Sequence, residues 1–267
     1  MVGRTVLVTG ATDGLGRAVA GDLVARGARV LVHGRDRARA EEVAERIGAG
    51  AVYVADLASL DEVRRLAAEV AGDHPALHVL VNNAGIGSTL PGDGARMESA
   101  DGHELRFAVN YLAGFLLTRL LEPTLIAGAP ARVVNVASAG QAPIDFDDVM
   151  LERGYDGSRA YAQSKLAQVM WTFDLADRLR DAGVTVNALH PSTYMPTKIV
   201  LHARGAGVDS LEDGVAATVR LAADPELDGV TGRYFDRTTE ARADPQAYDA
   251  EARRRLRELS ERLTGLA

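Results

Sequence analysis

Short apolar runs and longer amphipathic stretches alternate along most of the chain. The apolar runs are rich in valine and leucine and almost free of polar residues. Parallel strands have this composition when both faces of their sheet are covered. We predict six strands from these runs and a weaker seventh near Gly232–Asp236. The six are Thr5–Thr9, Arg29–His33, Ala51–Val54, Val79–Asn82, Arg132–Ala137 and Thr185–His190.

The stretches between the runs have the length of helices, and several are followed by a glycine, which is typical of a helix C-terminus. The predicted helices are Gly16–Arg26, Arg37–Ile47, Leu60–Ala71, Ala100–Ile126, Ala160–Ala182 and Leu211–Ala223. This order of elements predicts one α/β domain over residues 1–267. We expect a Rossmann fold, in which a doubly wound parallel sheet of about seven strands carries helices on both faces.

The last part of the chain is also amphipathic. Ala250–Leu263 places leucines at positions 256, 259 and 263 among charged residues, which predicts a helix at about 248–264 packed on the body of the domain. We interpret its charges as a solvated helix face rather than a binding site.

Composition narrows the class of protein. The absence of cysteine excludes disulfides, thiolate zinc sites and cysteine nucleophiles. The net charge of −7 argues against a nucleic-acid or anionic membrane surface, and no apolar run approaches the roughly 20 residues that cross a bilayer. We expect a soluble cytoplasmic protein without a metal, nucleic-acid or membrane partner. Only Lys165 and Lys198 among the 30 basic residues are lysines, a bias that suggests a bacterial source with GC-rich coding.

A glycine-rich turn follows the first predicted strand and leads directly into a helix. Its glycines, Gly10, Gly14 and Gly16, have the spacing G-x-x-x-G-x-G. Such glycines let the backbone approach a pyrophosphate closely, and the helix N-terminus offers free N–H groups to it. The turn therefore predicts a dinucleotide site, although glycines are also common in turns that simply connect a strand to a helix.

The end of the second strand bears on the choice of dinucleotide. An acidic residue there would accept hydrogen bonds from the adenosine ribose and favour NAD(H), whereas an arginine pairs with the ribose phosphate of NADP(H). The sequence has Gly34 at the expected acid position and Arg35 next to it. We predict NADP(H) as the preferred cofactor. NAD(H) stays possible through Asp36, and Arg35 could be an ordinary surface arginine.

A tyrosine and a lysine lie four residues apart in Tyr161-Ala162-Gln163-Ser164-Lys165, so on a helix they share one face. A nearby ammonium favours the phenolate and lowers the tyrosine pKa, which would suit Tyr161 to proton transfer. Ser138 follows a predicted strand at the carboxyl edge of the sheet, where ligands bind, and its hydroxyl could orient a carbonyl oxygen. Each of these residues alone has an ordinary explanation, as a surface pair or a turn serine.

Together, TGATDGLG, the segment Asn82-Asn83-Ala84-Gly85, Asn110 in FAVNYLAGFLLT, Ser138 and YAQSK resemble the short-chain dehydrogenase/reductase family over about residues 4 to 236. Within that family the chain is most similar to the branch of retinol dehydrogenases and protochlorophyllide reductases. The cues are VNNAGI, RFAVNYLAGFLLTRLL, RVVNVAS, YAQSKLAQ and the insert around Ile144–Asp148.

The resemblance implies a role for each matching residue. Tyr161 would be the acid/base, Lys165 would lower its pKa and bind the nicotinamide ribose, Ser138 would hold the substrate oxygen, and Asn110 would anchor a water on a proton path. The implied cofactor contacts are Gly10, Thr12, Asp13, Gly14, Leu15, Gly16, Arg35, Asp56, Leu57, Asn83, Ala84, Gly85, Tyr161, Lys165, Pro191, Ser192 and Thr193. One residue departs from the family pattern, because Ser192 stands where a glycine is usual.

These residues predict reversible hydride transfer between a nicotinamide and a ketone or secondary alcohol. A segment at about 193–210 is expected to cover the site. Its apolar residues suggest a lipophilic or polycyclic substrate, or only local core packing; they are Tyr194, Met195, Ile199, Val200 and Leu201.

Two other functions stay open, a non-redox lyase or cyclisation reaction and a non-catalytic NADP(H)-binding regulator. The resemblance also implies a homodimer or homotetramer formed through the helices predicted at Ala100–Ile126 and Ala160–Ala182.

Overall fold

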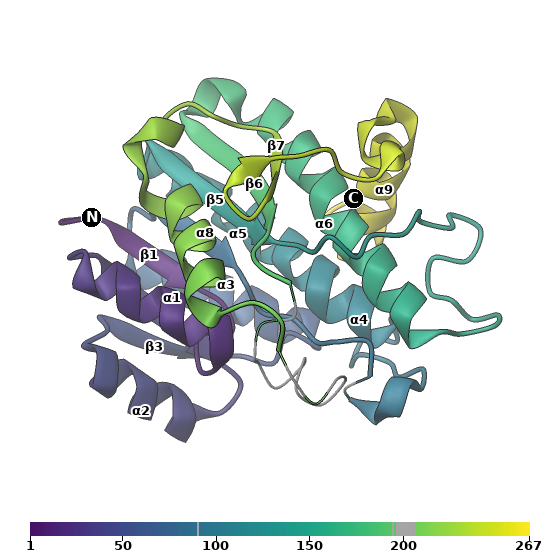
Figure 1. Cartoon of the computed structure of the whole chain (residues 1–267), viewed down its shortest axis with the longest axis horizontal. Helices are drawn as coiled ribbons and strands as arrows, with labels where there is room; N and C mark the ends of the chain where they lie inside the picture. The colour runs from purple at the N-terminus through teal and green to yellow at the C-terminus, as the bar shows by residue number, and fades with distance from the viewer. Residues whose placement is uncertain (90, 194, 196–204, 206) are drawn as a thin grey trace.

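A computed structural model of the chain describes residues 1–89, 91–193, 195, 205 and 207–267. Its centre is a single eight-stranded sheet with the order β3-β2-β1-β4-β5-β6-β7-β8 (Figure 1). All neighbouring strands pair in parallel except the last two, which are antiparallel. The strands are β1 Thr5–Val8, β2 Arg29–Gly34, β3 Ala51–Val54, β4 Val79–Asn82, β5 Ala131–Val136, β6 Val184–His190, β7 Arg233–Asp236 and β8 Thr239–Glu240.

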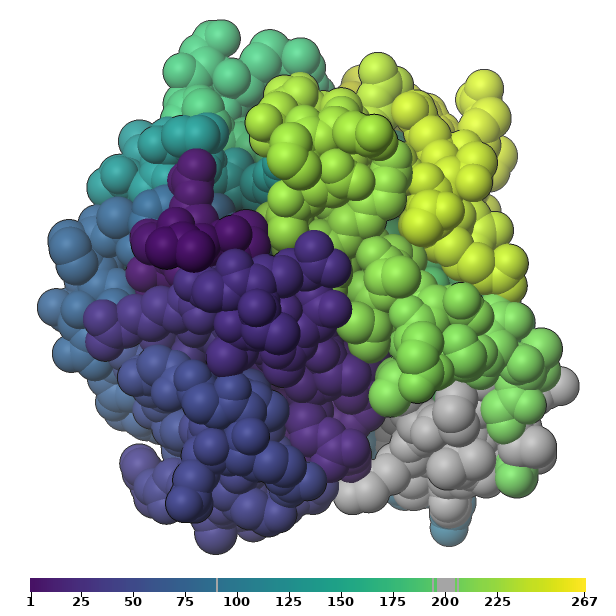
Figure 2. All heavy atoms as spheres, turned by 60° about the vertical axis from the view of Figure 1, so that its left-hand side comes forward, coloured from purple at the N-terminus to yellow at the C-terminus, as the bar shows by residue number. Residues whose placement is uncertain are grey.

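Helices cover both faces of the sheet. One layer consists of α1 Gly14–Ala25, α2 Arg37–Ile47 and α8 Leu211–Ala223. In Figure 2 this face is turned forward, and the purple N-terminal segment lies directly beside the green of α8. The opposite layer consists of α3 Leu60–Asp73, α5 Ala113–Ala127, α6 Gly157–Arg178 and the C-terminal α9 Ala250–Leu263. Short helical turns complete the chain at α4 Leu105–Phe107, η1 Gly92–Gly94, η2 Ala108–Leu112, η3 Arg180–Ala182, η4 Pro225–Leu227 and η5 Pro245–Tyr248.

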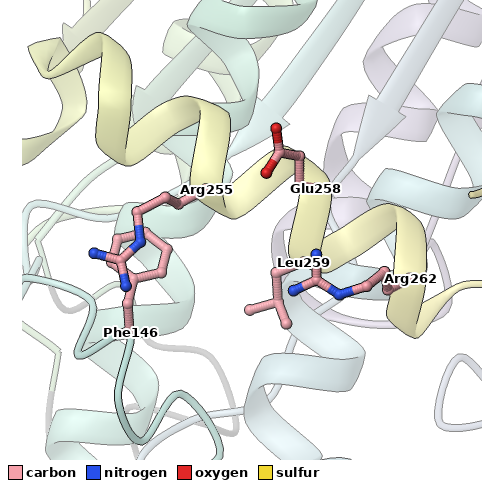
Figure 3. Close-up of a pocket in the computed structure, with 5 residues that line it drawn as sticks. All are labelled: Phe146, Arg255, Glu258, Leu259 and Arg262. Atoms are coloured by element: carbon pink, nitrogen blue, oxygen red, sulfur yellow. The ribbon is translucent and has the colours of Figure 1, made fainter.

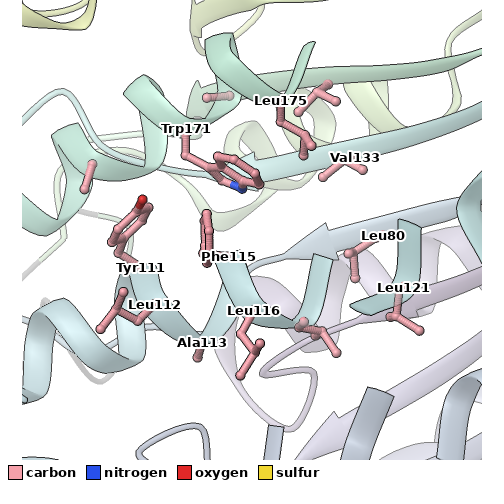
Figure 4. Packing of buried hydrophobic residues seen from close by; sticks show 14 of the residues in the cluster. Leu80, Tyr111, Leu112, Ala113, Phe115, Leu116, Leu121, Val133, Trp171 and Leu175 are labelled. Atoms are coloured by element: carbon pink, nitrogen blue, oxygen red, sulfur yellow. The ribbon is translucent and has the colours of Figure 1, made fainter. Parts of the chain in front are cut away.

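Successive side chains of each strand point to opposite faces of the sheet and pack into two separate cores. In β1, Leu7 enters the core under α3, α5 and α6, whereas Val6 and Val8 enter the core under α1 and α8. Figure 4 shows the first core from close by, where Phe115 of α5 packs against Trp171 of α6 with ring centroids 4.5 Å apart. Because both faces are buried, the strands need continuous apolar runs, which is the pattern that the sequence carries.

The fold class predicted from the sequence is confirmed, with corrections at three elements. The helix predicted at Ala100–Ile126 is wrong at its start, because residues 100–102 form a turn and the helix begins only at Leu105, capped by the Glu104 side chain. The helix predicted from Ala160 begins at Gly157, where Asp156 caps it, and it ends at Arg178 before a separate 3₁₀ turn. The two-residue strand β8 was not predicted, since its sequence is too short for any periodicity.

The C-terminal helix α9 crosses the outer side of the α6 layer. The Ser260 hydroxyl lies 2.7 Å from the Tyr111 hydroxyl, and Arg257 pairs with Asp174 of α6 at 2.6 Å. Along the same stretch of α9, Arg255, Glu258, Leu259 and Arg262 line a surface pocket together with Phe146 (Figure 3). The Arg255 guanidinium carbon lies 4.5 Å from the Phe146 ring centroid, which makes this a cation–π contact on the surface.

The described part of the chain contains no helix long and apolar enough to span a membrane. Within the same residues, no three histidine, cysteine, aspartate or glutamate side chains gather in a way that could hold a metal ion.

Candidate functional site

The candidate site lies at the carboxyl edge of the sheet, where the strand order reverses between β1 and β4. Doubly wound sheets bind ligands in the crevice at such a switch point. The turns that follow the two strands meet closely here: a Cβ atom on Gly10 would lie 2.8 Å from the Cα of Ala84. The Asn83 amide fixes this meeting by donating to the carbonyl oxygens of Thr9, at 2.8 Å, and Gly10, at 3.2 Å.

The glycines of the turn are required by its geometry. Gly10 and Gly14 have φ angles of 64° and 47°, and a Cβ atom on Gly16 would lie 2.3 Å from the Gly10 carbonyl oxygen. Asp13 caps α1 by accepting from the Gly14 N–H at 2.8 Å. The first turn of a helix leaves N–H groups without intrahelical partners, here including those of Leu15 and Gly16. The turn therefore fits the pyrophosphate of a dinucleotide.

Within the residues that the structure describes, the end of β2 offers no free acidic side chain to bind the adenosine ribose. A Cβ atom on Gly34 would lie 2.3 Å from the Thr12 methyl group, so a larger side chain at the usual acid position would require Thr12 to move. Asp36 is used as the N-cap of α2, where it accepts from the Arg39 N–H at 3.0 Å. Arg35 is exposed beside the turn. Of the three, Arg35 is the side chain that can reach a ribose phosphate.

The segment expected on the adenine side follows β3. Leu57 is buried, and the Asp56 side chain accepts from the Ala58 N–H at 3.0 Å. The Asp56 N–H itself donates to Glu62 of α3 at 2.6 Å. These bonds fix the carboxylate of Asp56 at the same edge as the glycine-rich turn.

Lys165 is buried under the edge of the sheet. Its Nζ donates to the carbonyl oxygen of Val136, the last residue of β5, and to the Gln168 side chain, both at 2.9 Å. It also lies 5.7 Å from the centroid of the Tyr161 ring, one helical turn earlier in α6. Burial lowers the pKa of Lys165 to about 7, so the group exchanges its proton near neutral pH.

Tyr161 is half-buried in the first part of α6. The capping Asp156 fixes the start of this helix, and the Ser164 hydroxyl donates to the Tyr161 carbonyl oxygen at 2.7 Å. The helix therefore presents Tyr161 and Lys165 on one face at the edge of the sheet, as the spacing in the sequence predicts.

Ser138 is half-buried two residues after β5. Its carbonyl oxygen accepts from the Tyr234 hydroxyl at 3.0 Å and from the Gln141 side chain at 2.8 Å, and its Oγ accepts from the Gly140 N–H at 3.1 Å. The Ser138 hydroxyl retains its own proton as a donor, which is what holding a carbonyl oxygen requires.

Asn110 lies in η2, a single π-helical turn between α4 and α5. Its Oδ1 accepts from the Ile86 N–H at 2.7 Å, and its Nδ2 donates to the Ile86 carbonyl, at 3.1 Å, and to the Ser164 hydroxyl, at 2.9 Å. A Cβ atom on Gly85 would lie 3.2 Å from Asn110 Oδ1 and 3.6 Å from Lys165 Nζ. Gly85 therefore leaves open the space between these two groups. The water path through Asn110 stays a prediction.

The residues after β6 are held in place by Asp209. Its carboxylate accepts from the Ser192 hydroxyl at 3.0 Å and from the Thr193 N–H at 2.8 Å, and it pairs with Arg237 at 2.5 Å. Pro191 and Ser192 are both buried. The serine that replaces the usual glycine is therefore explained by its bond to Asp209.

With this geometry in place, the comparison with known proteins is direct. A family model described as short chain dehydrogenase matches residues 4–204. The chain belongs to the short-chain dehydrogenase family. Over its full length it is 39% identical to human retinol dehydrogenase 14, of which it covers 88%. The predicted family and its retinol dehydrogenase-like branch are confirmed.

Two solved structures show the same short-chain dehydrogenase fold. An uncharacterized protein from Mycobacterium paratuberculosis has a TM-score of 0.80 and 31% identity, with 99% of this chain and 94% of that chain covered. The NADP active-site complex of Pseudomonas aeruginosa RhlG has a TM-score of 0.72 and 28% identity, with 88% and 95% covered. The chain is thus an NAD(P)-dependent oxidoreductase that acts on alcohol or carbonyl groups.

The segment predicted to cover this dehydrogenase site lies mostly outside the described residues. Of the apolar residues singled out there, Tyr194, Ile199, Val200 and Leu201 are not described, and only Met195 is. Met195 is buried in the core under α1 and α8, where its sulfur would lie 2.3 Å from a Cβ atom on Gly214. Its apolar character therefore reflects core packing and says nothing about the substrate.

Several residues that shape this short-chain dehydrogenase site were not predicted from the sequence. Thr9 accepts from the N–H groups of Asn83 and Ala84, at 3.0 and 3.1 Å, and so joins the two turns. Gln168 and Tyr234 fix Lys165 and Ser138, as described above. Thr9 stands next to the recognised glycine turn, which was the signal available for it. For Gln168, the helical spacing of three residues from Lys165 was the available signal, whereas Tyr234 is brought to the site only by the fold.

Proposed function

We propose that the chain catalyses NADP(H)-dependent, reversible hydride transfer between the nicotinamide ring and a ketone or secondary alcohol. The observation that carries this proposal is the arrangement at the ends of β5 and α6, where Lys165 is bound to Val136 and lies beneath the Tyr161 ring. Ser138 follows β5 at the same edge. A regulator that only binds the cofactor would not need a buried lysine beside a tyrosine.

The bound cofactor would supply or accept the hydride. Gly10, Gly14 and Gly16 would form its pyrophosphate turn, and Lys165 would contact its nicotinamide ribose. In the reducing direction, the Ser138 hydroxyl orients the carbonyl oxygen of the substrate. Tyr161 donates its phenolic proton to that oxygen as negative charge develops there. The protonated form of Lys165 lowers the energy of the resulting phenolate, so the lysine and tyrosine titrate as a coupled pair.

The preference for NADP(H) is supported by the end of β2. The usual acid position holds Gly34, packed against the Thr12 methyl group, and Asp36 is engaged as a helix cap. Arg35 is left to pair with a ribose phosphate, the ligand for which a planar guanidinium is best suited. Complexes with NADP among structurally similar proteins point in the same direction.

We also propose a lipophilic or polycyclic substrate. The support is the similarity over the whole chain to proteins named retinol dehydrogenases.

The cytoplasmic location and the bacterial source stay predictions, as does the homodimer or homotetramer. An assembly through α5 and α6 would have to include α9, because α9 lies against these helices.

The test measures NADPH oxidation at 340 nm with a panel of lipophilic ketones, followed by mass analysis of the product. A reduced product supports the proposal. A rearranged but unreduced product would instead support lyase or cyclisation chemistry.

The cofactor preference is tested by comparing the Kd values of NADPH and NADH in the wild type, Arg35→Ala and Arg37→Ala. Arg37 is a matched control, because it is an exposed arginine two residues away that pairs with Glu41. We expect only Arg35→Ala to weaken NADPH binding, while NADH binding is unchanged. Equal affinity of the wild type for the two cofactors would refute the NADP(H) preference.

A further inference from the structure

A buried histidine at the end of β2 connects two parts of the predicted cofactor site. His33 is 1% exposed, and its Nδ1 accepts from the Gly10 N–H at 3.2 Å. Its Nε2 lies 3.2 Å from the carbonyl oxygen of Ala55. An N–H group can only donate and a carbonyl can only accept, so the ring is the neutral tautomer with its proton on Nε2.

The two partners of His33 belong to different ligand regions. Gly10 opens the glycine-rich turn after β1, and Ala55 directly precedes Asp56, which is expected on the adenine side after β3. The main chain of His33 takes part as well, because its carbonyl oxygen accepts from the Ala11 N–H at 2.9 Å. One residue of the middle strand thus ties the turn on one neighbouring strand to the segment that follows the other.

The chemical state of His33 suits this connection. Burial lowers the pKa of His33 to about 4, so the ring stays neutral at physiological pH and its Nδ1 remains an acceptor. A neutral imidazole with one acceptor and one donor nitrogen is the only form that satisfies both partners. Neither the glycine motif nor the catalytic residues assign His33 a role.

We propose that His33 is a positioning residue for the dinucleotide, which sets the distance between the pyrophosphate turn and the adenine-binding segment. The inference rests on the proposed cofactor site. It predicts that losing the His33 bonds to Gly10 and Ala55, called the His33 bridge below, weakens binding most for a ligand that contacts both regions at once. A ligand that occupies only the adenosine end should be affected much less.

A histidine beside the start of β1 provides a control. His78, which precedes β4, accepts through Nδ1 from the Thr5 N–H at 2.9 Å, the same kind of bond at the opposite edge of the sheet from the site. Replacing either histidine by leucine leaves a main-chain N–H without its partner, and the His33 variant also leaves the Ala55 carbonyl oxygen unpaired, so it should lose more stability. Only the His33 variant should change cofactor binding.

The experiment measures the Kd values of NADP⁺ and adenosine 2′-monophosphate by titration calorimetry for the wild type, His33→Leu and His78→Leu. The first ligand spans both regions, and the second has the adenosine end without the pyrophosphate. We expect His33→Leu to weaken NADP⁺ about tenfold, an order-of-magnitude expectation for a lost positioning contact, and adenosine 2′-monophosphate by much less. His78→Leu should bind both ligands as the wild type does.

Two conservative variants cover the case in which His33→Leu does not fold. Asn reaches about as far as Nδ1 and Gln about as far as Nε2, so His33→Asn and His33→Gln each keep one contact of the bridge. Each should weaken NADP⁺ more than adenosine 2′-monophosphate. Wild-type affinity for NADP⁺ in these variants, or equal weakening of both ligands, would overturn the inference. If the wild type itself binds no nicotinamide dinucleotide, the proposed function fails instead.

Discussion

The Lys165 Nζ lies 5.7 Å from the centroid of the Tyr161 ring and donates to the main chain of Val136 at 2.9 Å. The end of strand β5 therefore fixes the lysine, and the lysine in turn lies under the tyrosine. Gln168 completes this arrangement from the next turn of α6. The cation–tyrosine geometry thus depends on the junction of β5 and α6, and not on the four-residue spacing alone.

Burial of Lys165 predicts a specific pH dependence of stability. Its pKa is lowered from 10.5 to about 7 in the folded state, so between these values the unfolded chain holds a proton that the folded chain has released. The free energy of unfolding of the wild type, relative to Lys165→Met, should therefore rise with pH above 7, by at most about 1.4 kcal/mol per pH unit. Urea unfolding at pH 7, 8 and 9 measures this. A difference that does not change with pH would contradict it.

A buried ion pair near the site predicts a large loss of stability. Arg106 and Glu104 have side chains 0% and 1% exposed, lie 3.6 Å apart and are bridged by the Tyr155 hydroxyl. Arg106 also donates to the carbonyl oxygens of Gly87 and Ser88, at 2.9 and 2.8 Å, in the loop after β4. Arg106→Met leaves a buried carboxylate without its cation and should cost about 3–5 kcal/mol of unfolding free energy.

The exposed pair of Arg46 and Glu42 is the control for this effect. Arg46→Met should change stability by only about 0–1 kcal/mol. The double variant Arg106→Met/Glu104→Gln should recover part of the loss, since neither charge then remains buried. Chemical denaturation of the four proteins tests the interpretation, which is wrong if the two single arginine variants are equally stable.

The contacts of Asp209 predict an effect on one end of the cofactor. Asp209→Ala releases Ser192, Thr193 and Arg237 together, and the first two are predicted to flank the nicotinamide. We expect severalfold weaker binding of NADPH with unchanged binding of 2′,5′-ADP, which lacks the nicotinamide. Asp213→Ala is the control, because this acidic residue contacts only Ser210 at the start of α8 among the hydrogen bonds described for it. Equal weakening of NADPH and 2′,5′-ADP binding would show that Asp209 acts through the general stability of the protein.

The Asp209 contacts should also be insensitive to pH in the neutral range. Hydrogen bonds from Thr193, and then from Arg237 and Ser192, hold the pKa of Asp209 below its usual value of 3.8. A lowered pKa means that the stabilisation is complete above the unfolded value and is lost as the pH falls below it. The ratio of NADPH affinities between the wild type and Asp209→Ala should therefore be constant from pH 6 to pH 8. A ratio that falls across this range would contradict the assignment.

The fold and the edge of the sheet that carries the site could be predicted from the sequence, because apolar periodicity locates strands and parallel strands end at one edge. The Tyr161 and Lys165 relationship could also be predicted, since it is local to one helix. The π-helical turn at Asn110 could not, because the extra residue is stabilised by Ile86 and Ser164, which are distant in sequence.

The same limit applies to His33, Arg106 and Ser192. The partners of His33 follow two other strands, Arg106 is bound by the loop after β4 and by Tyr155, and the partner of Ser192 is 17 residues away. No local pattern marks such residues. The helix start at Leu105 was different, because Asp101-Gly102 in the sequence is a turn signal that the long apolar pattern obscured.

Tyr161→Phe tests the central claim most directly. The variant removes only the phenolic hydroxyl, so the ring above Lys165 and the cofactor site remain. NADPH oxidation in the presence of a ketone that the wild type reduces should fall by about 10²-fold to 10⁴-fold, the usual contribution of a general acid, while the Kd for NADPH is unchanged. Turnover by Tyr161→Phe at the wild-type rate would contradict the account.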